Sequence, residues 1–165
     1  WPLPGLLAGL LTGFVVLFPM LLALVQLRQL GPLILLCTMA IVWAADVAAY
    51  FAGRAFGKSK LAPSISPGKT WAGAWGAVFG VLVYGFAANN WLPQALQKSL
   101  LLFAITLVGL TVLSIVGDLF ESLLKRQAAL KDSSNILPGH GGILDRIDSQ
   151  TSTLPIVATL WLLPL

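Results

Sequence analysis

The pattern of hydrophobic and polar positions divides this chain into five long apolar stretches separated by short polar joins. A helix needs roughly 17 to 25 apolar residues to cross a bilayer, and each stretch is close to that length. We therefore predict an all-α, polytopic integral membrane bundle with about five transmembrane helices joined by polar loops. The stretches cover residues 3–25, 32–51, 71–91, 99–117 and 149–165.

Composition also indicates a membrane protein. Hydrophobic residues make up 58% of the chain and charged residues only 10%, whereas an ordinary soluble domain carries about 25% charged residues. Residues 1–165 contain no soluble second domain, internal repeat or low-complexity tract, so we predict a single membrane-embedded domain. Cys37 lies in an apolar stretch and has no second cysteine to pair with, which indicates a packing role. Because the sequence opens on Trp1 instead of methionine, we expect a longer protein that starts upstream.

The four joins differ in basic charge. The first join contains only Arg28 and the third only Lys98, whereas the second and fourth carry several lysines and arginines. Since cytoplasmic loops collect basic residues, the second and fourth joins are expected on the cytoplasmic face, with the N-terminal end inside and the C-terminal end outside. Topology alone could explain Lys58 and Lys60, but it does not explain the acids interleaved with the basic residues of the fourth join.

The acidic residues concentrate near the ends of the apolar stretches. An aspartate in the middle of a membrane helix costs about 2.5 to 3.5 kcal/mol on insertion scales, so such acids are usually functional or paired. Asp46 has the costliest position, because it lies inside an apolar stretch between VWAA and VAAYF. It either belongs to a site or forms an ion pair with Arg54 or Lys58. The other acids are Asp118, Glu121, Asp132, Asp145 and Asp148.

The segment GDLFESLLKR places polar groups on one helical face. Asp118, Ser122 and Lys125 recur at helical spacing, and so do Glu121 and Lys125. A carboxylate, a hydroxyl and a cation therefore line the polar end of an otherwise apolar helix.

The segment LDRID carries two acids at the entrance of the last apolar stretch. Asp145 and Asp148 are three residues apart, which on one helical turn directs both carboxylates the same way. Paired aspartates without adjacent histidine or cysteine favour a hard cation, above all magnesium. A favourable interaction with the dipole of a helix N-terminus would explain the same placement without a metal.

Two glycine-containing segments could bind phosphate. PGHGG places three glycines around His140, which allows backbone amides to approach an anion closely, and SPGKT supplies Lys69 with two hydroxyls. Neither segment is a Walker A loop, because the glycine spacing before the lysine is absent. His140 could be an ordinary loop residue, but the ionisable groups around it favour a substrate contact.

The segment from Ser122 to Asp148 resembles the signature of the phosphatidate cytidylyltransferases, also called CDP-diacylglycerol synthases. DVAAYFAGRAFGK, SPGKTW and GDLFES resemble other blocks of that family, so the resemblance covers about residues 40–160. Two features depart from the family: Ala72 stands where Glu or Gln is common, and the family's further N-terminal helices are absent from this sequence. The matching signature positions are Ser122, Lys125, Arg126, Lys131, Asp132, His140, Gly141, Gly142, Asp145, Arg146 and Asp148.

The resemblance implies that the domain is catalytic and that it joins CTP to phosphatidate, giving CDP-diacylglycerol and pyrophosphate in phospholipid biosynthesis. It implies Mg2+, alone or with a second metal or a monovalent cation, held near Asp118, Asp145 and Asp148. The catalytic residues it implies are Asp118, Asp145, Asp148, Lys125 and Arg126. The substrate-binding residues it implies are Asp46, Ser66, Lys69, Ser122, Lys131, His140, Gly141, Gly142 and Arg146.

The resemblance also implies partners and a location. We expect CTP, phosphatidate and membrane lipids as partners, no nucleic acid, and a homodimer as a compatible assembly. The expected location is the bacterial inner (plasma) membrane, with the active site facing the cytoplasm. Two alternatives remain: a related CTP-dependent lipid kinase, which would cleave CTP at the γ-phosphorus, and a membrane transporter whose intramembrane acids form a cation pathway.

Overall fold

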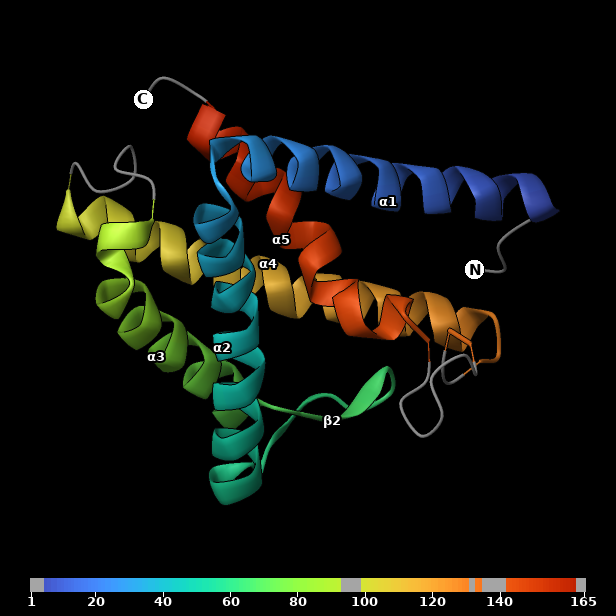
Figure 1. The fold of residues 1–165 in the computed structure, drawn as a ribbon. Coiled ribbons are helices and arrows are strands. Elements are labelled where there is room, and N and C mark those ends of the chain that lie inside the picture. The colour runs from blue at the N-terminus through green and yellow to red at the C-terminus, as the bar shows by residue number, and fades with distance from the viewer. Residues whose placement is uncertain (1–4, 93–98, 131–132, 135–141, 163–165) are drawn as a thin grey trace.

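The computed structural model describes residues 5–92, 99–130, 133–134 and 142–162, and within them the chain forms five α-helices and one hairpin (Figure 1). The prediction of an all-α helical bundle is therefore confirmed, with a short hairpin added. The elements are α1 (Gly5–Leu30), α2 (Pro32–Phe56), β1 (Lys60–Ala62), β2 (Ser66–Thr70), α3 (Trp71–Ala87), the 3₁₀ turn η1 (Asn89–Trp91), α4 (Leu100–Gln127) and α5 (Leu144–Leu162).

The helices pack in two groups. α2 packs against α3, and α5 lies between α1 and α4 (Figure 1). A contact between α3 and α4 joins the two groups. The hairpin and the end of α4 lie near each other, since Arg126 Nε donates a hydrogen bond to the carbonyl oxygen of Ile65 at 3.4 Å. The two basic joins of the sequence thus meet on one side of the bundle.

Three of the described helices are long and apolar enough to cross a membrane: α1 over Leu7–Leu30, α2 and α4. Each of the five predicted stretches corresponds to a helix, but α3 has only 17 residues, because the chain turns into η1 after Ala87. α5 begins at Leu144, earlier than the predicted stretch, and its first half is polar. Large apolar side chains such as Leu7 and Phe51 are 72% and 65% exposed, as expected of a surface that faces lipid. The chain is a membrane protein.

Small residues allow α2 and α3 to approach each other closely. A side chain at Gly76 of α3 would overlap the Cβ atom of Ala52 of α2, and one at Gly80 would overlap that of Ala48. Close packing through small residues is a common way for membrane helices to associate, because lipid supplies no hydrophobic driving force between them. This packing fixes α2, which carries Asp46, against the beginning of α3.

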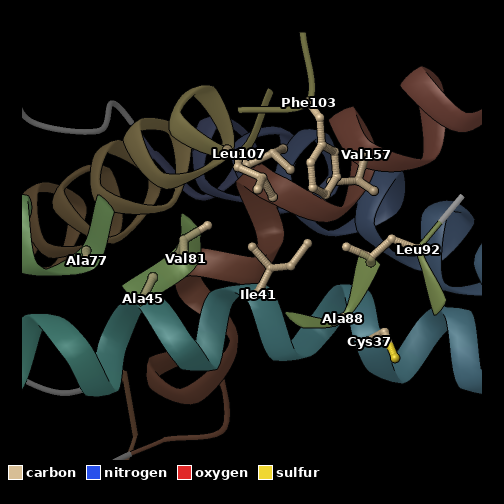
Figure 2. Packing of buried hydrophobic residues seen from close by; sticks show 11 residues of the cluster. Cys37, Ile41, Ala45, Ala77, Val81, Ala88, Leu92, Phe103, Leu107 and Val157 are labelled. Atoms are coloured by element: carbon tan, nitrogen blue, oxygen red, sulfur yellow. The ribbon is translucent and has the colours of Figure 1, made fainter. Parts of the chain in front are cut away.

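Buried apolar side chains join the helices at two places. Figure 2 shows the larger cluster, in which Ile41 of α2, Val81 of α3, Leu107 of α4 and Val157 of α5 meet. Cys37 belongs to this cluster as a buried cysteine, so its predicted packing role is confirmed. The smaller cluster joins α1 to α5 and contains Met20, Ala23, Leu27, Leu154 and Ala158.

The hairpin β1–β2 has no counterpart among the sequence predictions. Its strands pair antiparallel, with Lys60 opposite Thr70. Pro67 cannot donate a backbone hydrogen bond, which β2 tolerates because it has one partner strand only. Thr70 then caps α3, where its Oγ1 atom accepts a hydrogen bond from the amide of Gly73 at 3.1 Å. Lys69 therefore lies on a strand that pairs with β1 and continues directly into the capped start of α3.

Candidate functional site

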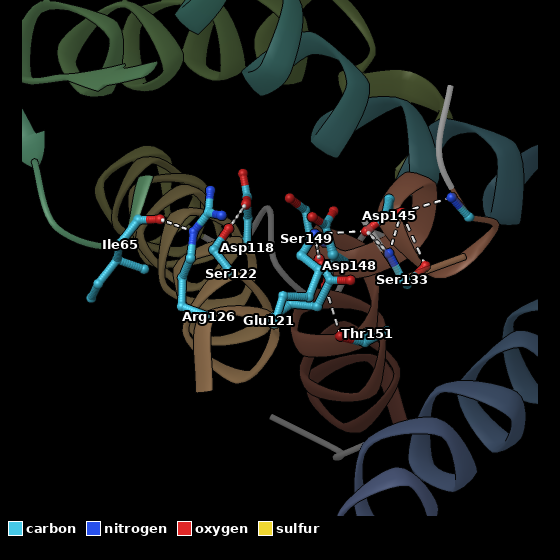
Figure 3. A network of polar contacts seen from close by, with 12 residues as sticks. Ile65, Asp118, Glu121, Ser122, Arg126, Ser133, Asp145, Asp148, Ser149 and Thr151 are labelled. Carbon is cyan, nitrogen blue, oxygen red and sulfur yellow. Dashed lines mark hydrogen bonds and ion pairs between the residues drawn. The ribbon is translucent and has the colours of Figure 1, made fainter. Parts of the chain in front are cut away.

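Polar side chains from four elements meet in one network on the side of the bundle where α4 ends and α5 begins. Figure 3 shows part of it, with the acids of α4 and α5 facing one another. The network unites residues that are far apart in the sequence. Its charged members are Asp46 from α2, Lys69 from β2, Asp118, Glu121 and Lys125 from α4, and Asp145 and Asp148 from α5.

Lys69 and Asp118 form the first ion pair of the network. The Nζ atom of Lys69 lies 2.6 Å from Oδ2 of Asp118 and donates to the carbonyl oxygen of Ile115 at 3.3 Å. The other carboxylate oxygen, Oδ1, accepts a hydrogen bond from Oγ of Ser122 at 3.3 Å. Both oxygens of Asp118 thus have a partner, and β2 is tied to α4.

Asp46 belongs to the same network. Its carboxylate interacts electrostatically with Asp118 and with Lys69. Among the ion pairs of residues 5–92, 99–130 and 142–162, none joins Asp46 to Arg54 or Lys58. Of the two interpretations of Asp46, a place in a site therefore agrees with the structure, and the ion pair does not.

Gly117 allows α5 to approach α4 beside these acids. A side chain at Gly117 would overlap Oγ and Cβ of Ser152, and this Oγ donates a hydrogen bond to the carbonyl oxygen of Leu113 at 3.0 Å. The close approach brings Asp148 of α5 against Glu121 of α4. Two carboxylates that face each other repel when both are ionised, unless a cation lies near them.

Lys125 supplies one such cation. Its Nζ atom lies 3.1 Å from Oε2 of Glu121 and 2.6 Å from Oδ1 of Asp145, so it bridges α4 and α5. The contact with Glu121 is an ion pair, and both oxygens of Glu121 are buried and accept no hydrogen bond of good geometry from the residues that the structure describes. Glu121 is therefore a buried acid whose charge is only partly compensated.

Asp145 anchors the start of α5. Besides the Lys125 ammonium, it accepts hydrogen bonds from the amide of Gly142 at 2.7 Å and from the amide and hydroxyl of Ser133 at 2.9 and 3.0 Å. Burial raises the pKa of Asp145, but these donors together hold it well below its usual range. Asp145 and Asp148 thus differ in their hydrogen-bond partners, although Lys125 interacts with both, and the prediction that both carboxylates point the same way stays a prediction.

A cavity of about 480 Å³ opens beside the network between α2, the hairpin, α3 and α4. Asp46, Asp118 and Lys69 line it, and so do Arg54 of α2 and Lys60 of β1. The cavity therefore combines acids with cations, as a site for a polyanion and its counter-ion requires.

The remaining predicted residues have simpler surroundings. Ser66 begins β2, and Arg146 is exposed on α5. The Gly142 N–H donates a hydrogen bond to Asp145, and the predicted contact of Gly142 with substrate stays a prediction. Lys131, His140 and Gly141 lie outside the described residues.

The structure adds residues that the sequence predictions leave out. Glu121, which the sequence places at helical spacing with Lys125 but which the predicted site residues did not include, joins the acid network. Tyr50 and Arg54 line the cavity and follow Asp46 at intervals of four residues, so helical spacing could have found them. Lys60 reaches the cavity only through the hairpin, for which the sequence carries no clear pattern.

The charges of the network fit a hard cation. When ionised, its five acids carry five negative charges against two positive charges of its lysines, which leaves an excess of three. Within the part of the chain that the structure describes, no group of three His, Cys, Asp or Glu residues is arranged to hold a metal ion by itself. Magnesium suits such a site, because it is usually held by one or two carboxylates and completed by water and substrate phosphates.

The chain is similar to known proteins. The sequence model of the Cytidylyltransferase family matches residues 5–163. Three relatives bear the name phosphatidate cytidylyltransferase. The Pseudomonas aeruginosa protein is 48% identical over 90% of this chain and 55% of its own length. The Haemophilus influenzae protein is 44% identical over 90% and 55%. The Bacillus subtilis protein is 42% identical over 80% and 48%. The chain thus spans about half the length of the curated relatives it matches.

Proposed function

The chain belongs to the cytidylyltransferase family, and from that membership we propose that the full-length protein is a phosphatidate cytidylyltransferase. It transfers the cytidylyl group of CTP to phosphatidate and releases pyrophosphate. The names of the relatives support these substrates, and the network of acids and lysines beside a cavity carries the proposal on structural grounds.

The proposed reaction needs charge neutralisation more than proton transfer. An oxygen of the phosphatidate phosphate forms a bond to the α-phosphorus of CTP, the bond from that phosphorus to the β-phosphate oxygen breaks, and pyrophosphate leaves with the bonding electrons. A phosphate monoester is already an anion at neutral pH, so no strong general base is required. The protein's task is to align two polyanions that repel each other.

The chain's own residues divide this task. Lys69 reaches the cavity from β2 and Lys125 bridges α4 and α5, so each can offset negative charge on a phosphate. Asp118 and Asp148 are the acids that would hold Mg2+, which when bound offsets the charge that develops on the leaving pyrophosphate. Asp118 would bind the ion in exchange for its contact with Lys69 or Ser122, and Asp145 could join only by releasing hydrogen bonds that it now accepts.

The products test the proposal directly. We expect purified full-length protein to convert CTP labelled on the α-phosphorus into labelled CDP-diacylglycerol, with one pyrophosphate released per lipid formed. Turnover should require Mg2+ or Mn2+ and stop in excess chelator, because carboxylate ligands favour hard ions. Release of CDP would indicate a lipid kinase instead. An absence of any labelled lipid, together with cation flux in vesicles, would indicate a transporter.

We further propose that the protein lies in the bacterial inner membrane with the cavity facing the cytoplasm. The meeting of both basic joins on one side of the bundle supports this orientation. Its assembly as a homodimer stays a prediction.

Thiol labelling in intact cells tests the orientation. In a Cys37→Ala background, cysteines at the exposed positions Ser64 and Gln127 should react with a membrane-impermeant reagent only after the membrane is permeabilised. A cysteine at exposed Asn90, in the join between α3 and α4, should react without permeabilisation. The opposite pattern would reverse the proposed topology.

A further inference from the structure

We propose that Arg54 and Lys60 bind the β- and γ-phosphates of the nucleotide and retain them as pyrophosphate when the bond to the α-phosphorus breaks. This inference rests on the proposed function and adds a phosphate subsite to it. Both residues line the cavity that also contains Asp46, Asp118 and Lys69.

The face of α2 that lines the cavity changes in character along the helix. Asp46, Tyr50 and Arg54 follow one another at intervals of four residues and all line the cavity. At 1.5 Å per residue, Arg54 lies about 12 Å along the helix axis from Asp46. The cavity thus has an acidic part at the network and a cationic part near the end of α2, where Lys60 joins it from the hairpin.

Within the described residues, the two cations differ from the lysines of the network in having no acidic partner. Lys69 and Lys125 each pair with a carboxylate, whereas no ion pair joins Arg54 or Lys60 to an acid among the residues that the structure describes. Arg54 Nη1 instead donates to the hydroxyl of Tyr50 at 3.2 Å, which orients the guanidinium and leaves other N–H groups to donate. Cations without acidic partners at a cavity wall are suited to phosphate oxygens.

The backbone of β2 leaves room beside these cations. Gly68 lines the cavity, and a Cβ atom built there would meet nothing within 4 Å. Packing within the chain therefore does not require glycine at this position. Because Gly68 has no side chain, a phosphate group can approach the backbone of β2 at the cavity wall.

The position of Arg54 and Lys60 in the cavity favours the phosphates of the nucleotide over the phosphate of the lipid. Arg54 lies in the last turn of α2 and Lys60 follows in the hairpin, so both belong to the water-facing end of the cavity, whereas Asp46 lies deeper in an apolar helix. A lipid phosphate anchored by its acyl chains approaches from the membrane. The triphosphate tail of a water-soluble nucleotide enters from the water and reaches the cationic end first.

The test compares Arg54→Gln and Lys60→Gln with Lys58→Gln in the full-length protein. Lys58 is an exposed cation of the same segment that does not line the cavity, so it controls for general surface charge. For each variant, we would measure the KM for CTP, the KM for phosphatidate in mixed micelles, and the inhibition constant of inorganic pyrophosphate. Thermal unfolding in detergent checks that the variants fold.

We expect Arg54→Gln and Lys60→Gln each to raise the KM for CTP and the inhibition constant of pyrophosphate about tenfold or more, because each loses charge-assisted hydrogen bonds. The KM for phosphatidate should stay unchanged, and Lys58→Gln should match the parent. A rise in the KM for phosphatidate alone would assign the cations to the lipid headgroup and overturn the inference. Unchanged constants in an active parent would also overturn it, whereas an inactive parent would refute the proposed function instead.

Discussion

Replacement of Asp148 by Asn is expected to lower turnover roughly 100-fold or more while the protein still folds. A bound divalent ion supplies several kcal/mol of charge stabilisation in the transition state, and each 1.4 kcal/mol corresponds to about a tenfold change in rate. Asn keeps the size and one oxygen of Asp148 but removes the charge that attracts the metal. The loss should be partly overcome at high Mg2+ concentration, because the remaining carboxylates still favour the ion.

Stability should change in the opposite direction from activity. Asp148 lies against Glu121, whose buried oxygens accept no hydrogen bond of good geometry within the described part of the chain. Neutralising one of two facing carboxylates removes repulsion, so the Tm of Asp148→Asn should equal or exceed that of the parent. The measurements are initial rates against Mg2+ concentration and thermal unfolding in detergent. Asp148→Glu, which keeps the charge, should retain more activity than Asp148→Asn, and near-normal turnover and Mg2+ dependence in the Asn variant would refute the metal assignment.

Replacement of Asp145 by Asn is expected to give the largest loss of stability. The Asp145 side chain is only 9% exposed and accepts hydrogen bonds from Lys125, Ser133 and Gly142. Asn cannot balance the charge of the partly buried Lys125, and its amide group places donors where acceptors are needed. The free energy of unfolding should fall by roughly 2 to 4 kcal/mol.

A double-mutant cycle with Lys125→Met isolates the ion pair. If the pair stabilises the protein as the geometry indicates, the double variant should be clearly more stable than the sum of the two single effects predicts. Additive effects would show that Asp145 stabilises the protein through its hydrogen bond with Gly142 and not through its ion pair with Lys125. The half-saturating Mg2+ concentration separates the two roles of Asp145: a metal ligand should shift it as Asp148→Asn does, whereas an anchoring residue should leave it near the parent value.

The stabilisation from Asp145 also depends on pH in a defined direction. Its pKa in the folded protein lies below the value of about 4 for an unfolded aspartate. The contribution is therefore complete above about pH 4 and is lost as the pH falls toward the lower folded value. Across the physiological range Asp145 stays ionised, so the difference in Tm between the parent and Asp145→Asn should be constant there.

The sequence by itself determined the class of the fold and most members of the site. Apolar stretches of membrane-spanning length can satisfy their backbone hydrogen bonds in lipid only as helices or closed barrels, so their length and composition were enough to predict the helical bundle. The high cost of an acid in such a stretch identified Asp46, and helical spacing placed Asp118 and Lys125 on one face. The resemblance named the family that the comparisons then showed.

Only the tertiary structure decided which of these residues share partners. Helical spacing within LDRID could not reveal that the amide of Gly142 and the ammonium of Lys125 take up Asp145, because those donors come from other segments. Nor could it reveal that Gly117 brings Glu121 against Asp148, since the contact depends on how closely α4 and α5 approach. Lys60 looks like a topology signal in the sequence and becomes a cavity residue only when the hairpin folds beside α2. Local patterns fix which side chains share a face of one helix, but the contacts between elements depend on packing over the whole chain.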